Sequence, residues 1–189
     1  DSLDIFLTHK HHDHCGLASE YAARGARLFM NPQEDRHCYD CLYYNHSHGS
    51  SEDQPQVLQS VGVTEEGTPE IWNMFMEVNQ RIRENRGWEF EIPGYPYTPV
   101  NEGQILSYGD YHLETVGLKG HTYGQMGLYD RNHKVLFCAD QVIDGIVPIV
   151  GTTYPDEHLL KGYFDSLERL KHQYGDCLIL PAHKEPIRD

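Results

Sequence analysis

The chain has 189 residues and a mass of 21.8 kDa, the size of one ordinary domain. Apolar residues make up 39% of it, which is enough for a buried core and excludes wholesale disorder. The formal net charge of −14 argues against a nucleic-acid binder, because contacts with phosphates need clustered lysine and arginine. No apolar run approaches the roughly 20 residues that span a bilayer, and no leader peptide is visible. The five cysteines lack the dense spacing of a secreted scaffold, so we expect reduced thiols, a cytoplasmic location and no membrane partner.

The N-terminal part predicts short strands and helices around a cluster of histidines. Residues 3–7 form a strand that runs into the cluster, residues 16–24 a short helix, and residues 27–30 a second strand. Asn31 and Pro32 supply the cap and the first-turn proline of another helix. Because a sheet strand begins at the very first residues, we expect the chain to be a piece of a longer protein.

A helical insertion is expected in the middle of the chain. Residues 46–56 are a polar loop, and Thr68 and Pro69 then open a clear helix. The apolar face of this helix repeats at spacings of four, three and four residues: Ile71, Phe75, Val78 and Ile82. Residues 94–99, rich in tyrosine and proline, predict a loop. We expect residues 64–99 to form an insertion that covers the site, within a single domain over residues 1–189.

The second half predicts a sheet followed by a long helix. Four short strand candidates are separated by Gly, Asp and Asn turns: residues 104–107, 112–116, 125–129 and 134–138. Asp156 can cap a helix that has one apolar side: Leu159, Leu160, Tyr163, Phe164, Leu167 and Leu170. Residues 177–180 form a short buried strand before Pro181. A β-rich middle with helices on both flanks predicts α/β layers.

The cluster from His9 to His14 has the composition of a metal site. In an extended stretch alternate residues face the same way, so His9, His11 and Asp13 can converge, whereas His12 points away. His14, next to a helix start, can reach the other side of the same cavity. Neutral imidazoles and a carboxylate are the ligands that zinc or a similar divalent ion takes. The alternative is a solvent-exposed, histidine-rich loop.

Three later residues strengthen the metal-site interpretation. His121 lies in a turn between two strand candidates, and Asp140 and His183 each follow an apolar strand. Side chains just beyond the carboxyl ends of strands are where α/β proteins build their sites. A separate cluster around Cys38 and Cys41 could bind a structural zinc, but its spacing is too compressed for the usual finger, so a helix with two free thiols is favoured.

Together these motifs resemble the metallo-β-lactamase superfamily of metal-dependent hydrolases, over residues 3 to about 187: His-x-His-x-Asp-His at 9–14, Gly-His-Thr at 120–122, the strand-end Asp140 and Pro-x-His at 181–183. The resemblance implies an αββα sandwich with two divalent ions at one edge of its two sheets, zinc foremost and iron or manganese as alternatives. It assigns the first metal to His9, His11 and His121. It assigns the second to Asp13, His14 and His183, with Asp140 bridging the two.

Family members usually have several strands before the histidine motif, and those strands are missing from this sequence. We therefore expect a bare sheet face that a second copy covers by homo-oligomerisation or strand exchange.

The resemblance also implies the chemistry. A hydroxide that bridges the two metals would attack a carbonyl or phosphoryl centre, and Asp13 could orient it and accept its proton. Asp140 disfavours β-lactamase activity, since true β-lactamases generally lack a bridging aspartate, and His11 argues against the oxygen-reducing diiron branch. We favour hydrolysis of an ester, thioester or lactone of a small molecule, as in thioesterases that resemble glyoxalase II.

Other functions stay open. The acidic composition weighs against nucleases, whereas a phosphodiesterase or a β-lactamase remains possible in principle. A rival from a different class is a metal-binding module, or an inactive fragment of such a hydrolase, without catalysis. Four aromatic residues could line an acyl pocket, or could pack in the core: Trp72, Trp88, Tyr95 and Tyr97.

Overall fold

A computed structural model describes residues 3–35, 58–59, 62–84, 94–150 and 155–188. The chain divides into two compact units. The first unit consists of residues 1–37 and 93–189, and the second of residues 38–92.

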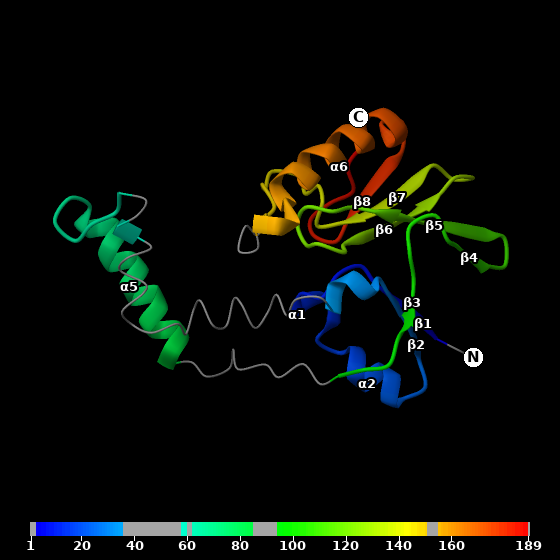
Figure 1. Ribbon diagram of the computed structural model, residues 1–189, viewed down its shortest axis with the longest axis horizontal. Coiled ribbons are helices and arrows are strands. Elements are labelled where there is room, and N and C mark those ends of the chain that lie inside the picture. The colour runs from blue at the N-terminus through cyan, green and yellow to red at the C-terminus, as the bar shows by residue number, and fades with distance from the viewer. Residues whose placement is uncertain (1–2, 36–57, 60–61, 85–93, 151–154, 189) are drawn as a thin grey trace. The chain divides into compact units, whose positions relative to one another are not determined.

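The first unit contains a small parallel sheet with the order β1-β2-β3. Its strands are β1 (Asp4–Leu7), β2 (Arg27–Met30) and β3 (Thr98–Pro99). Two short helices, α1 (His12–Cys15) and α2 (Ala18–Ala23), connect β1 to β2 in a βαβ unit (Figure 1). The predicted strands over 3–7 and 27–30 and the helix that ends before Gly25 are therefore present.

The predicted loop over 94–99 is wrong at its end, because Thr98 and Pro99 pair with β2 as a third strand. Proline has no N–H to donate, and an edge strand tolerates it. The backbone N–H of the next residue, Val100, donates a hydrogen bond to the Met30 carbonyl of β2 at 3.0 Å.

A five-stranded sheet with the order β4-β5-β6-β7-β8 forms the larger part of the first unit. Its strands are β4 (Ile105–Tyr108), β5 (Tyr111–Gly117), β6 (Met126–Asp130), β7 (Val135–Ala139) and β8 (Leu178–Pro181). Neighbouring strands are antiparallel except β7 and β8, which α6 (Leu159–Tyr174) joins as a crossover helix. All five strands lie within two residues of their predicted positions.

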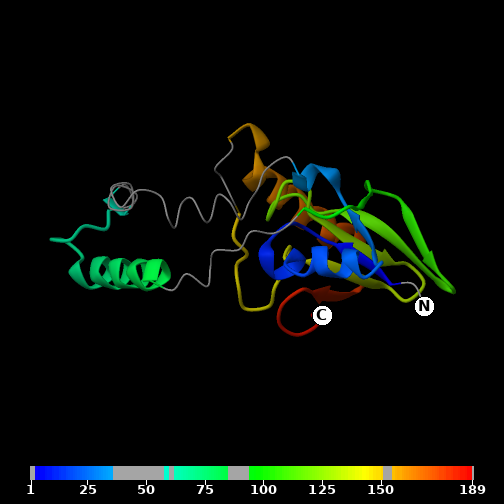
Figure 2. The same ribbon diagram turned by 90° about the horizontal axis from the view of Figure 1, so that it is seen from below.

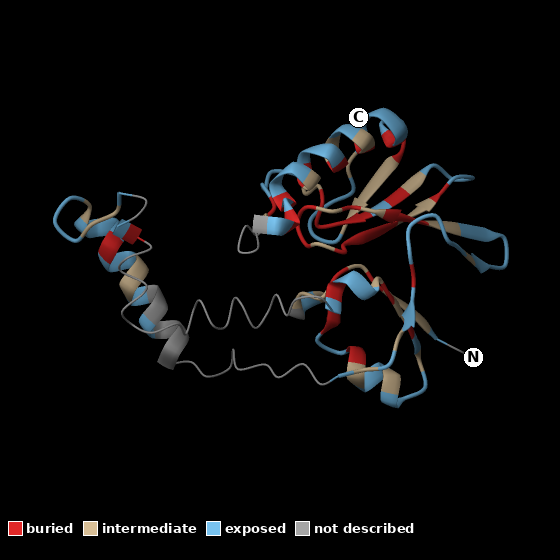
Figure 3. Cartoon of the chain, in the orientation of Figure 1, coloured by how far each residue is buried: buried red, intermediate tan, exposed pale blue. Residues whose placement is uncertain are grey.

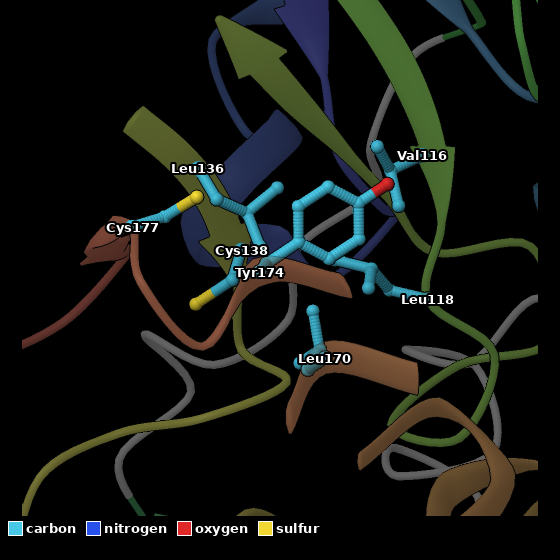
Figure 4. Close-up of a cluster of buried hydrophobic side chains, with 7 residues drawn as sticks. All are labelled: Val116, Leu118, Leu136, Cys138, Leu170, Tyr174 and Cys177. Carbon is cyan, nitrogen blue, oxygen red and sulfur yellow. The ribbon is translucent and has the colours of Figure 1, made fainter. Parts of the chain in front are cut away.

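The core of this part lies between α6 and the five-stranded sheet. Seven buried side chains form it (Figure 4): Val116, Leu118, Leu136, Cys138, Leu170, Tyr174 and Cys177. Buried residues gather on the inner side of α6 and along β6 and β7 (Figure 3). With α2 on the outer face of the small sheet, the layers are α2, small sheet, large sheet and α6 (Figures 1 and 2), the αββα order that the motifs implied.

The start and the buried face of α6 differ from the prediction. Asp156 does not cap it, because residues 155–157 form a separate 3-10 turn, η3 (Pro155–Glu157). His158 is the N-cap, in a left-handed conformation and without a side-chain cap bond. Leu160 and Phe164 are exposed, because the buried stripe runs through residues 159, 163, 166, 170 and 174, one position further round the helix.

The second unit contains α5 (Pro69–Glu84), which begins at the predicted proline. Trp72 is its buried side chain, whereas Ile71, predicted to face a core, is exposed. The side chains of Val78 and Ile82 lie outside the described residues, as do Trp88 and the polar loop over 46–56. Among the described residues, no helix combines the length and the apolar character that crossing a membrane requires.

Candidate metal centre

The histidine cluster begins where β1 ends. His9 is fully buried in the segment after the strand, and the chain then turns into α1. The backbone N–H groups of His14 and Cys15 both donate to the His11 carbonyl, at 3.0 Å. The prediction that strand alternation carries Asp13 into the site is therefore wrong. One helical turn brings Asp13 and His14 there instead. The side chain of His12 lies outside those that the structure describes.

Three histidines form the first group of potential ligands. The Nε2 atom of His9 lies 3.1 Å from Nδ1 of His11, and Nε2 of His121 lies 2.9 Å from the same Nδ1. One ligand atom from each of the three fits within a span of 4.8 Å. Residues that are 110 positions apart in the sequence thus meet in one cluster.

The second group lies beside the first and opens toward solvent. The Nε2 atoms of His14 and His183 lie 3.4 and 3.3 Å from Oδ2 of Asp13. Asp13 and His183 are almost half exposed, whereas the side chain of His14 is 12% exposed. The cluster is therefore closed at its His9 end and accessible at its His183 end.

Asp140 connects the two groups. Its Oδ2 atom lies 3.5 Å from Nε2 of both His14 and His121 and 3.4 Å from Nε2 of His183. The structure thus brings all seven predicted ligands together. Their division between two metals remains a prediction.

The site has the features that a bound cation requires. Oδ1 of Asp140 is buried and has no hydrogen-bond partner among the described residues. Isolated buried carboxylate oxygens are costly, so a partner that the protein itself does not supply is expected there. Ring nitrogens that face one another across 2.9–3.1 Å and carboxylate oxygens beside them form the donor set of a divalent metal.

The pKa values favour the forms that bind metals. Burial lowers the pKa of His9 far below its usual value, and burial together with His121 lowers the pKa of His11 to about 4. Burial opposes ionisation of Asp140, but the neighbouring His14, His121 and His183 bring its pKa below the ordinary value. At neutral pH these imidazoles are neutral and this carboxylate is charged.

Several neighbours orient these ligands. Nδ1 of His121 donates to the Ile149 carbonyl at 2.7 Å, which leaves Nε2 facing the cluster. Gly120 places the same loop against α6: its φ is +151°, and a Cβ atom there would lie 2.6 Å from Cα of Tyr163. The side chain of Gln125 donates to Gln141, and both are buried behind Asp140. No motif in the sequence marked Ile149, Gln125 or Gln141.

Apolar surface lies beside the cluster. A cavity of about 260 Å³ is lined by two of the ligands, Asp13 and His14, and by six other residues: Ile5, Leu7, Gly16, Leu17, Ala18 and Tyr21. The segment that ends in Ile149 also exposes apolar side chains: Ile146, Val147 and Ile149 are 48, 85 and 76% exposed.

Other predicted residues lie elsewhere. Tyr97 donates to Asp35, and the Tyr95 hydroxyl lies 3.8 Å from the Met30 sulfur, so both contact the small sheet and the turn after it. Cys38 and Cys41 are outside the described residues, and the structure does not test whether they bind zinc. Four scattered histidines are exposed, as expected of surface residues: His112, His133, His158 and His172.

Comparisons with known proteins identify the family of the chain. The family model of the metallo-beta-lactamase superfamily matches residues 3–183. The acyl-coenzyme A thioesterase MBLAC2 of Gallus gallus is 42% identical over 53 residues, which are 28% of this chain and 19% of that protein. The Homo sapiens MBLAC2 is 32% identical over 63 residues, or 31% of this chain and 23% of that protein.

Solved structures share the fold. The metallo-beta-lactamase family protein TTHA1429 of Thermus thermophilus superimposes with a TM-score of 0.67 and 24% identity, over 99% of this chain and 56% of that one. TTHA1623, solved in a di-iron-bound form, gives a TM-score of 0.60 and 22% identity, over 98% of this chain and 71% of that one. The matches to the two MBLAC2 proteins span less than a quarter of the length of those proteins. By its sequence motifs, its layers and the grouping of its histidines and aspartates, the chain belongs to the metallo-beta-lactamase superfamily of metal-dependent hydrolases.

Proposed function

We propose that the protein holds two divalent ions, zinc foremost with iron or manganese as alternatives, and hydrolyses an ester, thioester or lactone of a small molecule. The observation that carries this proposal is the convergence of seven ligand-type side chains from distant parts of the chain. In this proposal the buried group of His9, His11 and His121 holds one ion. The more open group holds the other: Asp13, His14 and His183, with Asp140 shared.

Two observations support an acyl substrate. The curated relatives are named as acyl-coenzyme A thioesterases, although the matched segments are short. Apolar surface also flanks the cluster on two sides, at the cavity that includes Leu17 and Tyr21 and at the segment that exposes Val147 and Ile149. An apolar acyl chain buries such surface, whereas a phosphodiester gains little from it.

The residues of the site would have different roles in hydrolysis, according to where each one lies. Ions bound in the cluster would bring the pKa of water toward ~7 and offset the negative charge that develops on the substrate oxygen. Asp13, at the open end and 3.3 Å from His183, is placed to orient the attacking water and take up its proton. The proton can then pass to the departing thiol or alcohol. The buried histidines keep solvent from the inner side of the site.

Three further expectations remain proposals. The described cysteines, Cys15, Cys138 and Cys177, are buried and form no disulfide with one another, which supports a reducing compartment such as the cytoplasm. Residues 64–99 are proposed to cover the site. The edge position of β1 in the small sheet and the exposed Leu3 just before it support a second copy that covers this edge. Light scattering tests the last point, and a stable monomer would contradict it.

The experiment compares wild type with His9→Ala and with a matched control, His133→Ala, at an exposed histidine outside the cluster. Zinc content is measured beside turnover of p-nitrophenyl esters, acyl thioesters, lactones and bis-p-nitrophenyl phosphate. We expect wild type and the control to bind two zinc ions and to cleave acyl substrates. His9→Ala should lose zinc and at least ~100-fold of the activity, since residues that merely support a ligand already account for 10–100-fold.

A metal-binding module without catalysis is the second candidate, because the ligand cluster supports metal binding whether or not a reaction follows. Its signature is zinc binding that depends on His9 with equal, background hydrolysis by wild type and His9→Ala. That result would overturn the proposed hydrolase activity. Cleavage of the phosphodiester alone would overturn the acyl substrate.

A further inference from the structure

Glu34 is a buried carboxylate that no motif and no part of the proposed mechanism accounts for. It lies in the 3-10 turn η1 (Pro32–Asp35) after β2 and is 0% exposed. The nearby Lys10 ammonium does not neutralise it directly, because Lys10 Nζ forms its ion pair with Asp35, at 2.6 Å. Burial of a carboxylate costs free energy unless hydrogen bonds satisfy its oxygens.

Three donors converge on this carboxylate. The backbone N–H of Lys10 donates to Oε2 at 2.9 Å. The hydroxyl of Thr122 and the backbone N–H of Gly124 donate to Oε1 at 2.7 and 2.6 Å. All three partners donate, so the hydrogen-bond set matches the ionised carboxylate.

These donors belong to the two segments that carry the first group of potential ligands. Lys10 stands between His9 and His11, and Thr122 follows His121. One side chain is therefore bonded to both segments at once. The approach depends on Gly124, because a Cβ atom there would lie 3.0 Å from Oε1 and 2.9 Å from the backbone nitrogen of Glu34.

We propose that Glu34 is a positioning residue, which holds the His9–His11 segment and the His121 loop at the spacing that the first metal needs. This inference rests on the proposed metal centre. Removing the carboxylate charge leaves the three donors poorly satisfied and frees the two segments to separate. The second group is expected to be spared, since the three groups that donate to Glu34 belong to Lys10, Thr122 and Gly124, beside the first group.

The test measures the two zinc affinities by competition with a chromophoric chelator, and the spectrum of the cobalt-substituted protein. Glu34→Gln is compared with wild type and with Glu20→Gln, which alters an exposed carboxylate paired with Arg24, outside the cluster. We expect Glu34→Gln to weaken one affinity by ~10–100-fold and to leave the other within about twofold, as for residues that support metal-binding histidines. The cobalt spectrum should change for that site alone, and Glu20→Gln should resemble wild type.

A second pair of variants keeps the test decisive if Glu34→Gln does not fold. Thr122→Val removes one donor with little change in volume, and Thr122→Ser retains the hydroxyl. We expect Thr122→Val to weaken the same single site and Thr122→Ser to restore it.

Equal weakening of both sites, or wild-type affinities in folded Glu34→Gln or Thr122→Val, would overturn the positioning role while leaving the proposed function intact. A wild-type protein that binds no metal would overturn both.

Discussion

Burial shifts the pKa values of individual acids and bases around the cluster in opposite directions. Burial and the neighbouring His121 lower the pKa of His11 to about 4, from 6.5. Burial raises the pKa of Glu34 to about 7, from 4.5, although three hydrogen bonds oppose the rise. Both shifts have the same origin, because a buried site disfavours whichever form carries charge.

These shifts predict how the stability of the metal-free protein depends on pH. His11 takes up a proton on unfolding between about pH 6.5 and 4, so its contribution is present above 6.5 and is lost as the pH falls. Glu34 releases its proton on unfolding, so its contribution is lost as the pH rises from 4.5 through about 7. Between about pH 4.5 and 6.5 the two contributions oppose each other, so we expect a plateau of stability there, with lower stability below about pH 4.5 and above about pH 7.

Urea unfolding of the chelator-treated protein between pH 4 and 8.5 measures this profile. Glu34→Gln should remove the opposing contribution, so that stability rises between about pH 4.5 and 6.5 instead of staying level. Parallel profiles of wild type and Glu34→Gln between pH 4.5 and 7 would contradict a raised pKa of Glu34.

At the scale of elements, the loop between β5 and β6 joins the core to the metal centre. Its Gly120 contacts α6 at Tyr163, and its His121 reaches the ligand cluster. Ser166 of α6 also donates to the Lys119 carbonyl of this loop, at 2.8 Å. The packing of α6 against this loop thus fixes the position of His121.

Gly120→Ala should therefore weaken metal binding, although Gly120 is not itself a potential ligand. The new Cβ would lie 2.6 Å from both Cα and Cβ of Tyr163, too close for any real contact, so the loop must move away from α6. We expect a lower melting temperature and at least ~10-fold weaker zinc binding. The control is Gly145→Ala, at a positive φ of 71° with nothing within 4 Å, which should incur only the left-handed penalty of ~1–2 kcal/mol. Equal zinc affinities for the two variants would refute this coupling.

At the scale of the whole molecule, all seven potential ligands belong to the first compact unit. The chain leaves this unit after η1 and returns before β3, and these two places are neighbours. Tyr97 donates to Asp35 across them, and β3 pairs with β2. The second unit is therefore inserted in the sequence between two segments of the first unit that contact each other.

Replacing residues 38–92 with a flexible glycine-serine linker should leave the zinc content unchanged, because no ligand is removed and Asp35 and Tyr97, on either side of the replaced segment, are hydrogen-bonded to each other. If residues 64–99 cover the site, the same variant should alter the KM for acyl substrates more than it alters zinc binding. Loss of zinc from a folded variant, judged by circular dichroism, would contradict the independence of the first unit.

The sequence predicted many elements of both units well because their signals are local. Alternating apolar residues and glycine turns placed the five strands of the large sheet, and a proline marked the start of α5. The same local signals gave a wrong prediction at Asp13, where the backbone turns into α1 instead of staying extended. They also gave a wrong prediction at Leu160, which is exposed because the buried face of α6 lies one position further round the helix.

The amino-acid sequence by itself determined the family, the layers and the identity of seven potential metal ligands, since these depend on residue type, spacing and strand ends. Only the tertiary structure decided that Glu34 lies between two histidine segments and that the Ile149 carbonyl accepts from His121. Such contacts join residues up to about 90 positions apart, and an isolated glutamate or isoleucine carries no local pattern that foretells them. Their roles follow from burial and hydrogen bonding, which exist only once the chain has folded.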